Sequence, residues 1–297
     1  MSGPATGGAP GGAPVLEVLE AGRGTTVQDL GRPGLAALGV GRSGAADRAA
    51  LRLANRLVGN PEGHAGLEVT LGGLTLVATA AVTVAVAGAP CSVTVDGRAE
   101  PAYSCVRVPA GATVRLGTPS TGLRGYLAVR GGVDVAPVLG SRATDTLAGV
   151  GPPPVEAGTR LPVGRPRGPL PDVDLAPVSP PTGGDVRLRV LPGPRLDWCD
   201  PGAWAVLLAT PWEVSADSDR VGLRLGGAEL RRVRDGELPS EGTVPGALQL
   251  PPTGRPTLLL ADHPVTGGYP VVGVVRSADV DRAAQARPGQ RLRFVAG

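Results

Sequence analysis

Short segments in which apolar and polar positions alternate recur along the whole chain, and Gly, Pro or Asp residues separate them. Examples are LEVTLGG, VTVAVAG, ATVRLG, VRLRVLPG and QRLRFVAG. A period of two with regularly spaced turn residues is typical of strands in β-barrels or sandwiches. The pair Asp96–Gly97, between VTV and RAE, predicts a two-residue hairpin turn. The pattern therefore predicts a mainly β fold with a few short helices.

Two segments depart from this pattern and show helical spacing. Within residues 43–60, apolar side chains recur at intervals of three and four. We expect Ser43 to cap this helix and Gly59 to end it. Residues 277–289 predict a second helix, with Ser277 as its cap.

The composition changes between about residues 150 and 180, where prolines become dense. Proline-rich segments behave as extended spacers between domains. We therefore expect a flexible tail at 1–14 and an N-terminal β domain at 15–180 that includes this linker. The remainder, 181–297, is expected to be a second β-barrel-type domain.

Composition and charge narrow the class of protein. The chain has 297 residues, of which 42% are hydrophobic and only 2% aromatic, so its core must consist of Val, Leu and Ala. The net charge of +3 is small and the Arg residues are scattered, which argues against a nucleic-acid surface. The most apolar window, 74–90, is interrupted by Thr and Gly and favours buried strands over a membrane span. We expect a cytoplasmic protein with no nucleic-acid and no membrane partner.

Several kinds of site are excluded by residue type. The chain contains no lysine, so a GxxxxGK[ST] phosphate-binding loop is impossible. His64 and His263 are far apart in sequence, and the three cysteines show no ligand spacing, so we expect no metal site.

Glycine-flanked polar residues form a first candidate site at 24–34 and 41–50. Free backbone N–H groups at a helix start near Ser43–Gly44 would suit a carboxylate or a phosphate. A tight turn followed by an ordinary helix cap explains the same residues. The polar turn at 140–145, GSRATD, has a solvated loop as its simpler interpretation.

The segment 240–270 is the strongest candidate site. Its apolar stretches ALQL and TLLLA predict a hairpin that brings Glu241 and Gln249 toward Asp262, His263 and Tyr269. Carboxylate, imidazole and phenol groups together can perform acid–base chemistry on an amide. In the alternative interpretation Asp262 caps a turn, His263 packs, and the glycines only permit positive φ.

Both candidate segments together supply the predicted site. The candidate catalytic residues are Asp262, His263, Tyr269 and Glu241. The candidate substrate-binding residues are Thr26, Gln28, Asp29, Arg42, Ser43, Gly44, Gln249, Thr266, Gly267 and Gly268.

Eight motifs in a fixed order resemble one protein family. They are TTVQDLGRPG, GVGRSGAADRAALRLANRLVGN, LRGYLAVRGG, VLGSRATDT, RVLPGPRLDW, SDRVGLRL, SEGTVPGALQLPP and LLLADHPVTGGYPVVGVV. From about residue 15 to 297 the chain resembles the family of 5-oxoprolinase C-type subunits. This family is also called biotin-dependent carboxyltransferase or allophanate-hydrolase-subunit-2-like. It includes the Kip antagonist and the carboxyltransferase region of urea carboxylase.

The resemblance implies a fold and an activity. It implies a cytosolic protein with two cyclophilin-like barrel domains, and a hydrolase subunit that is inactive alone. The implied reaction is the ATP-dependent opening of the cyclic amide 5-oxoproline to glutamate. Partners resembling the B-type and A-type subunits of 5-oxoprolinase would complete the complex, with ATP shared with or bound by them.

Two other functions fit the same resemblance. One is a biotin-dependent carboxyltransferase that acts on a urea-like amide, with biotin on a separate carrier. The other is a regulatory binding protein that antagonises a kinase inhibitor. In the hydrolase, Asp262 or Glu241 would orient water, His263 would transfer a proton and Tyr269 would donate to the developing oxyanion.

Overall fold

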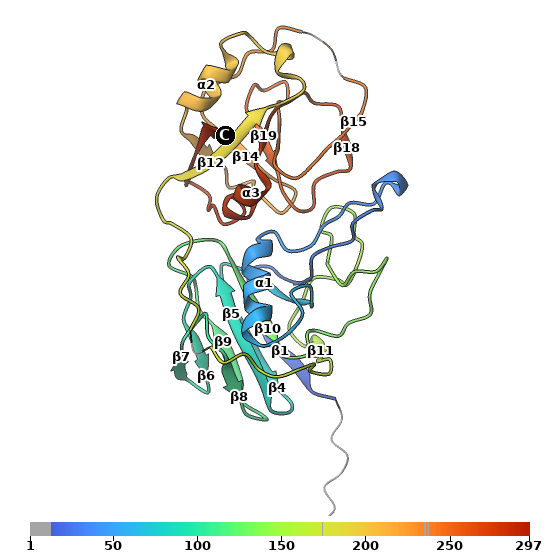
Figure 1. The fold of residues 1–297 in the computed structure, drawn as a ribbon, viewed down its shortest axis with the longest axis vertical. Helices are drawn as coiled ribbons and strands as arrows, with labels where there is room; N and C mark the ends of the chain where they lie inside the picture. The colour runs from blue at the N-terminus through green and yellow to red at the C-terminus, as the bar shows by residue number, and fades with distance from the viewer. Residues whose placement is uncertain (1–12, 174, 235, 237) are drawn as a thin grey trace, which may run out of the picture.

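The computed structural model describes residues 13–173, 175–234, 236 and 238–297. The chain forms two halves that are stacked along the long axis of the molecule (Figure 1). Strands β1 to β11 build the lower half, and strands β12 to β20 build the upper half. Most of the tail predicted at 1–14 lies outside the described residues.

The first half consists of two antiparallel sheets. One has six strands in the order β11-β1-β4-β9-β6-β7, and the other has five in the order β2-β3-β10-β5-β8. The strands are β1 Val15–Ala21, β2 Thr25–Gln28, β3 Gly66–Thr70, β4 Leu74–Ala78, β5 Val82–Gly88, β6 Val93–Val95, β7 Arg98–Glu100, β8 Val106–Val108, β9 Thr113–Leu116, β10 Arg124–Val129 and β11 Arg160–Pro162. The Asp96–Gly97 hairpin between β6 and β7 is confirmed, and both residues have positive φ.

The second half contains a closed barrel. Its strand order is β12-β19-β16-β17-β14-β13-β20, and β12 closes it by parallel pairing with β20. The strands are β12 Val186–Pro192, β13 Trp212–Val214, β14 Gly222–Gly226, β16 Ala247–Gln249, β17 Thr257–Leu259, β19 Val271–Val275 and β20 Arg291–Ala296. A separate two-stranded sheet pairs β15 (Glu241–Gly242) with β18 (Thr266–Gly267). The mainly β prediction is confirmed, with a closed barrel in the second half and two open sheets in the first.

Burial follows from the position of each strand. Along β12, Val186, Leu188 and Val190 face the barrel interior, and the Arg residues between them face outward. In β10 all six residues are buried, because this strand lies between β3 and β5. One face of β10 packs in the sheet-to-sheet core, and the other packs against helix α1 (Arg48–Leu57).

The helices are shorter than the sequence pattern predicts. Helix α1 begins at Arg48, and the carboxylate of Asp47 accepts from the backbone N–H of Ala50 at 2.9 Å. The prediction that Ser43 caps this helix is therefore wrong, because the carboxylate of Asp47, about one turn later in the chain, takes that role. Helix α3 spans Ser277–Ala283 and its N-cap is Arg276, so the predicted Ser277 cap is also wrong.

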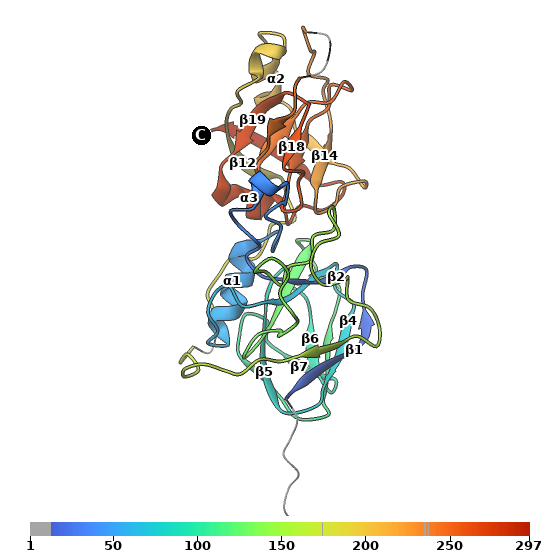
Figure 2. The ribbon, with the colours of Figure 1, turned by 90° about the vertical axis from the view of Figure 1, so that its right-hand side faces the viewer.

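Other short helical elements were not predicted from the sequence. They are α2 (Ala203–Ala209), η1 (Ala36–Leu38) and η2 (Leu196–Trp198). The loop with η1 projects from the first half toward the barrel (Figures 1 and 2). No helix among the described residues has the length and apolar character that a membrane crossing requires.

The proline-rich segment is only partly a connection. Its strand β11 pairs with β1 in the six-stranded sheet, so this part belongs to the first half. The predicted boundary near residue 180 falls between β11 and β12. The division into domains at 15–180 and 181–297 stays a prediction.

Candidate functional site

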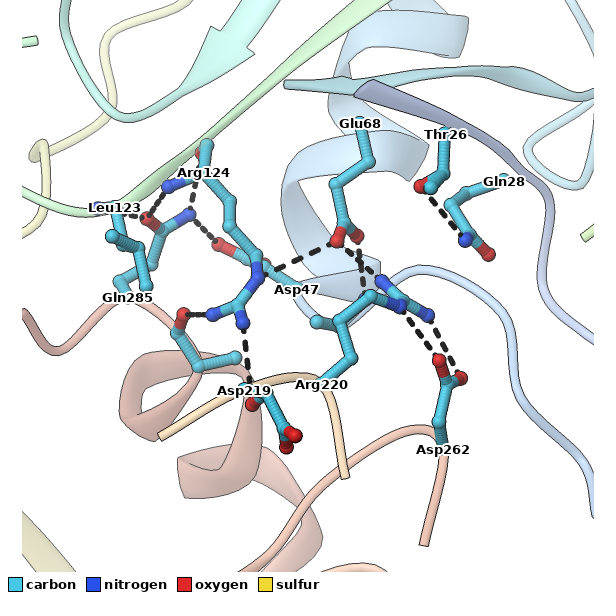
Figure 3. Close-up of polar contacts among 12 residues, drawn as sticks. Thr26, Gln28, Asp47, Glu68, Leu123, Arg124, Asp219, Arg220, Asp262 and Gln285 are labelled. Atoms are coloured by element: carbon cyan, nitrogen blue, oxygen red, sulfur yellow. Dashed lines mark hydrogen bonds and ion pairs between the residues drawn. The ribbon is translucent and has the colours of Figure 1, made fainter. Parts of the chain in front are cut away.

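A buried polar network joins the two halves (Figure 3). Arg220, just before β14, donates from Nε to Oδ2 of Asp262 at 2.8 Å and from Nη2 to Oδ1 at 3.0 Å. Its Nη1 donates to the carboxylate of Glu68 on β3, and its Nη2 also donates to the carbonyl of Gly44 at 2.6 Å. One barrel guanidinium thus binds two carboxylates, one from each half.

Asp262 accepts more hydrogen bonds than any other predicted catalytic residue. Besides Arg220, it accepts from the Ser43 hydroxyl at 2.6 Å and from the N–H and hydroxyl of Thr146 at 2.9 and 2.7 Å. Burial raises its pKa, but the charge of Arg220 and these donors outweigh burial, and the pKa lies below its ordinary value. The arrangement favours an anchoring role for an ionised carboxylate, and a direct catalytic role stays a prediction.

Glu68 is a central residue that the sequence analysis missed. Its carboxylate is 1% exposed and accepts from the N–H of Ala46 at 2.9 Å and from the hydroxyl of Tyr126 at 2.7 Å. Burial raises its pKa, but the guanidinium groups of Arg220 and Arg124 outweigh burial and hold the pKa below the ordinary value. The signal in the sequence was one charged residue within the apolar strand GLEVT, which was interpreted only as a strand.

A second contact between the halves involves Gln285, which follows α3. Its Nε2 donates to Oδ2 of Asp47 at 2.8 Å and to the carbonyl of Arg124 at 2.9 Å. Its Oε1 accepts from the N–H groups of Leu123 and Arg124, both at 2.9 Å. Burial raises the pKa of Asp47 to about 6, and the hydrogen bond from Gln285 opposes that rise.

These contacts occupy the start of helix α1. The N–H groups of Ala46 and Asp47 donate to Glu68 and Tyr126, and that of Ala49 donates to Asp281 at 3.2 Å. Protein groups therefore already satisfy these three donors. An anion site at Arg42, Ser43 and Gly44 stays a prediction. Arg42 is exposed, and Gly44 has a φ of +94° that allows its backbone to pack against Gly31.

In the polar turn at 140–145, residues 141 and 143–145 are buried against the first candidate segment rather than solvated. Asp29 accepts from the Ser141 hydroxyl and from the N–H of Arg142, both at 2.7 Å. Gln28 donates from Nε2 to Oγ1 of Thr26 at 3.0 Å and to the carbonyl of Thr144 at 2.9 Å. The solvated-loop interpretation was wrong because it ignored the carboxylate of Asp29, which is distant in sequence.

His263 lies next to this turn, at the junction of the halves. Its Nδ1 lies 2.9 Å from Oγ1 of Thr243 and 2.8 Å from the carbonyl of Pro264. Burial lowers its pKa, so the imidazole is neutral at pH 7, and Nε2 forms no hydrogen bond with the described residues. A methyl group on Gly41 would lie 3.5 Å from Oδ2 of Asp145 and 3.6 Å from the carbonyl of His263. The backbone of Gly41 therefore lies beside both residues.

The other predicted residues lie on β15, β16 and β18, or just after β18 in the case of Gly268 and Tyr269. Glu241 opposes Gly267 in the small sheet and binds Arg195, whose Nε lies 3.0 and 3.1 Å from its two oxygens. The hydrogen bond from Arg195 lowers the pKa of Glu241. Tyr269 is 42% exposed, and the buried amide of Gln249 contacts Gly267. The structure therefore brings Gln249 and Gly267 together, but it commits Glu241 to an ion pair.

Nearly the whole chain is similar to known proteins. A profile of the carboxyltransferase domain, subdomain A and B, matches residues 38–296. The chain is 39% identical to the C-type subunit of 5-oxoprolinase from Escherichia coli over 95% of its own length and 91% of that protein. The solved structure of TTHA0988 matches 96% of the chain at 38% identity, with a TM-score of 0.87, and the chain spans 56% of it. The Kluyveromyces lactis urea carboxylase matches at 30% identity and a TM-score of 0.87, and the chain spans 28% of it.

Proposed function

The chain belongs to the carboxyltransferase domain family, subdomain A and B, and from this premise we propose that it is the C-type subunit of an ATP-dependent 5-oxoprolinase. The reaction adds water across the ring C–N bond of 5-oxoproline and yields glutamate. The observation that carries the proposal is the similarity to the Escherichia coli protein over nearly the full length of both chains. The name of that relative designates one subunit among several, which points to further subunits in the working enzyme.

The substrate site in this proposal is the junction near His263. Here the loop at 39–45 and residues 145–146 of the first half meet Asp262 and His263 of the second half. The Arg220 network beneath it binds both halves and limits their relative movement. Preorganised groups of this kind are what an amide-opening site needs, because they add no reorganisation cost during the reaction.

In this arrangement His263 is the residue that transfers protons. Ring opening requires a base that takes a proton from the attacking water and an acid that returns a proton to the departing nitrogen. The neutral imidazole, held through Nδ1, presents Nε2 as the acceptor for the first step, and the imidazolium supplies the second. Asp145, whose charge acts on the imidazole, stabilises the protonated intermediate. Tyr269 lies on the rim as a donor for substrate oxygen.

We place ATP binding with the partner subunits or at a surface shared with them. The chain has no lysine and no phosphate-binding loop of the GxxxxGK[ST] type. ATP hydrolysis can then be coupled to opening of the amide only in the assembled complex. For this reason we expect the chain alone to be inactive.

The test of this proposal is reconstitution. The chain is purified with candidate B-like and A-like subunits, and glutamate release from 5-oxoproline is measured with and without ATP. We expect glutamate only when ATP and all subunits are present. ATP-dependent glutamate release by the other subunits without this chain would refute the assignment.

A second candidate function is carboxyl transfer from biotin to a urea-like amide. The similarity to Kluyveromyces lactis urea carboxylase over 96% of the chain favours it. The absence of lysine means that biotin would have to be attached to a separate carrier protein. Transfer of carboxylate from carboxybiotin to urea, with no turnover of 5-oxoproline by the reconstituted complex, would select this function.

A further inference from the structure

Several buried side chains of the first half carry polar atoms without hydrogen-bond partners. One of them, Arg124, still has the carboxylate of Glu68 at 3.4 Å from its Nε. Three others have no such counter-charge: Oε1 of Gln28, Nε and Nη1 of Arg32, and Oγ1 of Thr144 are unpaired, and these three residues are at most 3% exposed. Buried polar groups in folded proteins are almost always paired, so a cluster of unpaired ones requires an explanation. None of these atoms has a partner among the described residues.

The three side chains form one cluster. Gln28 donates from Nε2 to the carbonyl of Thr144 at 2.9 Å, and Arg32 donates from Nη2 to the carbonyl of Ala143. The N–H of Thr144 donates to the carbonyl of Val27 at 2.9 Å. The end of β2 and residues 143–144 thus hold all the unpaired atoms close to one short stretch of backbone.

Arg32 makes this cluster cationic. Arg32 as a residue is 2% exposed, and its guanidinium forms no ion pair with any described carboxylate. The nearest acid in sequence, Asp29, is occupied by Gly31, Ser141 and Arg142. A buried charge without a counter-ion costs several kcal/mol, so a folded protein that keeps one is suited to receive an anion.

We infer that Arg32, Gln28 and Thr144 form a binding site for a small carboxylate. A guanidinium matches a carboxylate in both charge and planar geometry. The unpaired Oε1 of Gln28 accepts from an amide N–H, and the Thr144 hydroxyl donates to a carbonyl oxygen. A five-membered lactam that bears a carboxylate presents these complementary groups.

The position of the cluster connects it to the proposed chemistry. Thr144 precedes Asp145, which lies beside Gly41 and His263. The carbonyl of Thr144 also accepts from Ser43 at 3.2 Å, and Ser43 in turn binds Asp262. The identity of the lactam rests on the proposed function. The existence of an anion site at Arg32 is independent of it.

The test compares two ligands that differ only in the carboxylate. Binding of 5-oxoproline and 2-pyrrolidinone to the full chain is measured by calorimetry for the native protein and for Arg32→Gln. We expect the native chain to prefer 5-oxoproline at least tenfold, and Arg32→Gln to lose that preference while it binds 2-pyrrolidinone unchanged. The matched control is Arg160→Gln, which removes an exposed arginine paired with Glu17 and should leave both affinities unchanged.

Other outcomes separate the anion site from the substrate. If 5-oxoproline does not bind but acetate raises the Tm of the native chain and not of Arg32→Gln, the anion site stands and the proposed substrate fails. An equal preference in Arg32→Gln, or a crystal structure at saturating 5-oxoproline with only water at Arg32, would overturn the inference. If Arg32→Gln does not fold, Thr144→Val decides, because it keeps the backbone contacts; we expect it to weaken 5-oxoproline binding threefold or more, and unchanged affinity overturns the inference.

Discussion

The Ser43 hydroxyl donates to Oδ1 of Asp262 at 2.6 Å, although 219 positions separate the two residues in the chain. This contact joins two glycine-rich segments, one from each half, at the junction where His263 lies. It also makes Asp262 part of the contact between the halves. Residues that hold this junction together should affect stability when they are replaced, whereas residues that act on the substrate should affect catalysis.

Asp262→Ala should act mainly by lowering the stability of the chain, and not by removing a group that reacts with the substrate. The substitution leaves the buried guanidinium of Arg220 without one of its two carboxylates, which typically costs about 3–5 kcal/mol. The free energy of unfolding, measured by urea titration, should fall by about that amount. Glu17→Ala, which breaks an exposed pair with Arg160, should change it by only about 0.5 kcal/mol. A stable but inactive Asp262→Ala protein would instead assign Asp262 to the reaction.

His263→Gln should lower kcat of the reconstituted complex by about 10²-fold or more, as expected for the loss of a general base. Stability should change little, because Gln retains a polar end near Thr243 and Pro264. In the native complex burial lowers the His263 pKa, so activity should fall only when the pH drops below the ordinary histidine value of about 6.5. The measurement is a pH–rate profile together with a histidine NMR titration. An acid limb that persists in His263→Gln would show that another group carries this step.

Gly41→Ala should affect the site without affecting the fold. The added methyl would meet Asp145 and His263 at 3.5 and 3.6 Å, which are ordinary van der Waals contacts, and Gly41 does not have a positive φ. We expect Tm within a few degrees of the native value and a raised KM for the substrate. The matched control is Gly111→Ala, because Gly111 lies between β8 and β9, away from the site, and has open space around it but a φ of +80°. It should lower Tm and leave KM unchanged. An unchanged KM in Gly41→Ala would place the substrate elsewhere.

Asp47→Asn should alter how stability depends on pH. Burial raises the pKa of Asp47 from 3.8 to about 6, so between these values the folded state binds a proton that the unfolded state lacks. The stabilisation from this proton is fully present below the unfolded pKa and is lost as the pH rises through about 6. Asn is also a good helix cap, so it should replace the carboxylate in α1.

The measurement for Asp47 is the free energy of unfolding at several pH values from about 4 to 7, which bracket the raised pKa. Relative to Asp47→Asn, the native chain should lose up to about 3 kcal/mol across this interval, at about 1.4 kcal/mol for each pKa unit. Comparing the two proteins cancels the opposite contributions of Glu68 and Asp262, whose lowered pKa values make stability fall in acid. Parallel curves for the two proteins would show that Asp47 does not titrate in this interval.

Much of the architecture was determined by the sequence itself. Strands such as VTVAVAG and ALQL, the Asp96–Gly97 hairpin and the family membership all followed from residue patterns, and the structure and comparisons confirmed them. Side-chain alternation and turn chemistry depend on neighbouring residues, so they can be recognised without knowing distant contacts.

Tertiary structure alone decided how the polar groups are paired. Asp47 rather than Ser43 caps α1, Glu68 binds two arginines, and Asp262 is saturated by donors from both halves. The isolation of Arg32 from any described carboxylate was equally invisible in the sequence. The physical reason is that burial and the partners of a charge, which set its pKa and its cost, come from segments that meet only when the two halves pack together.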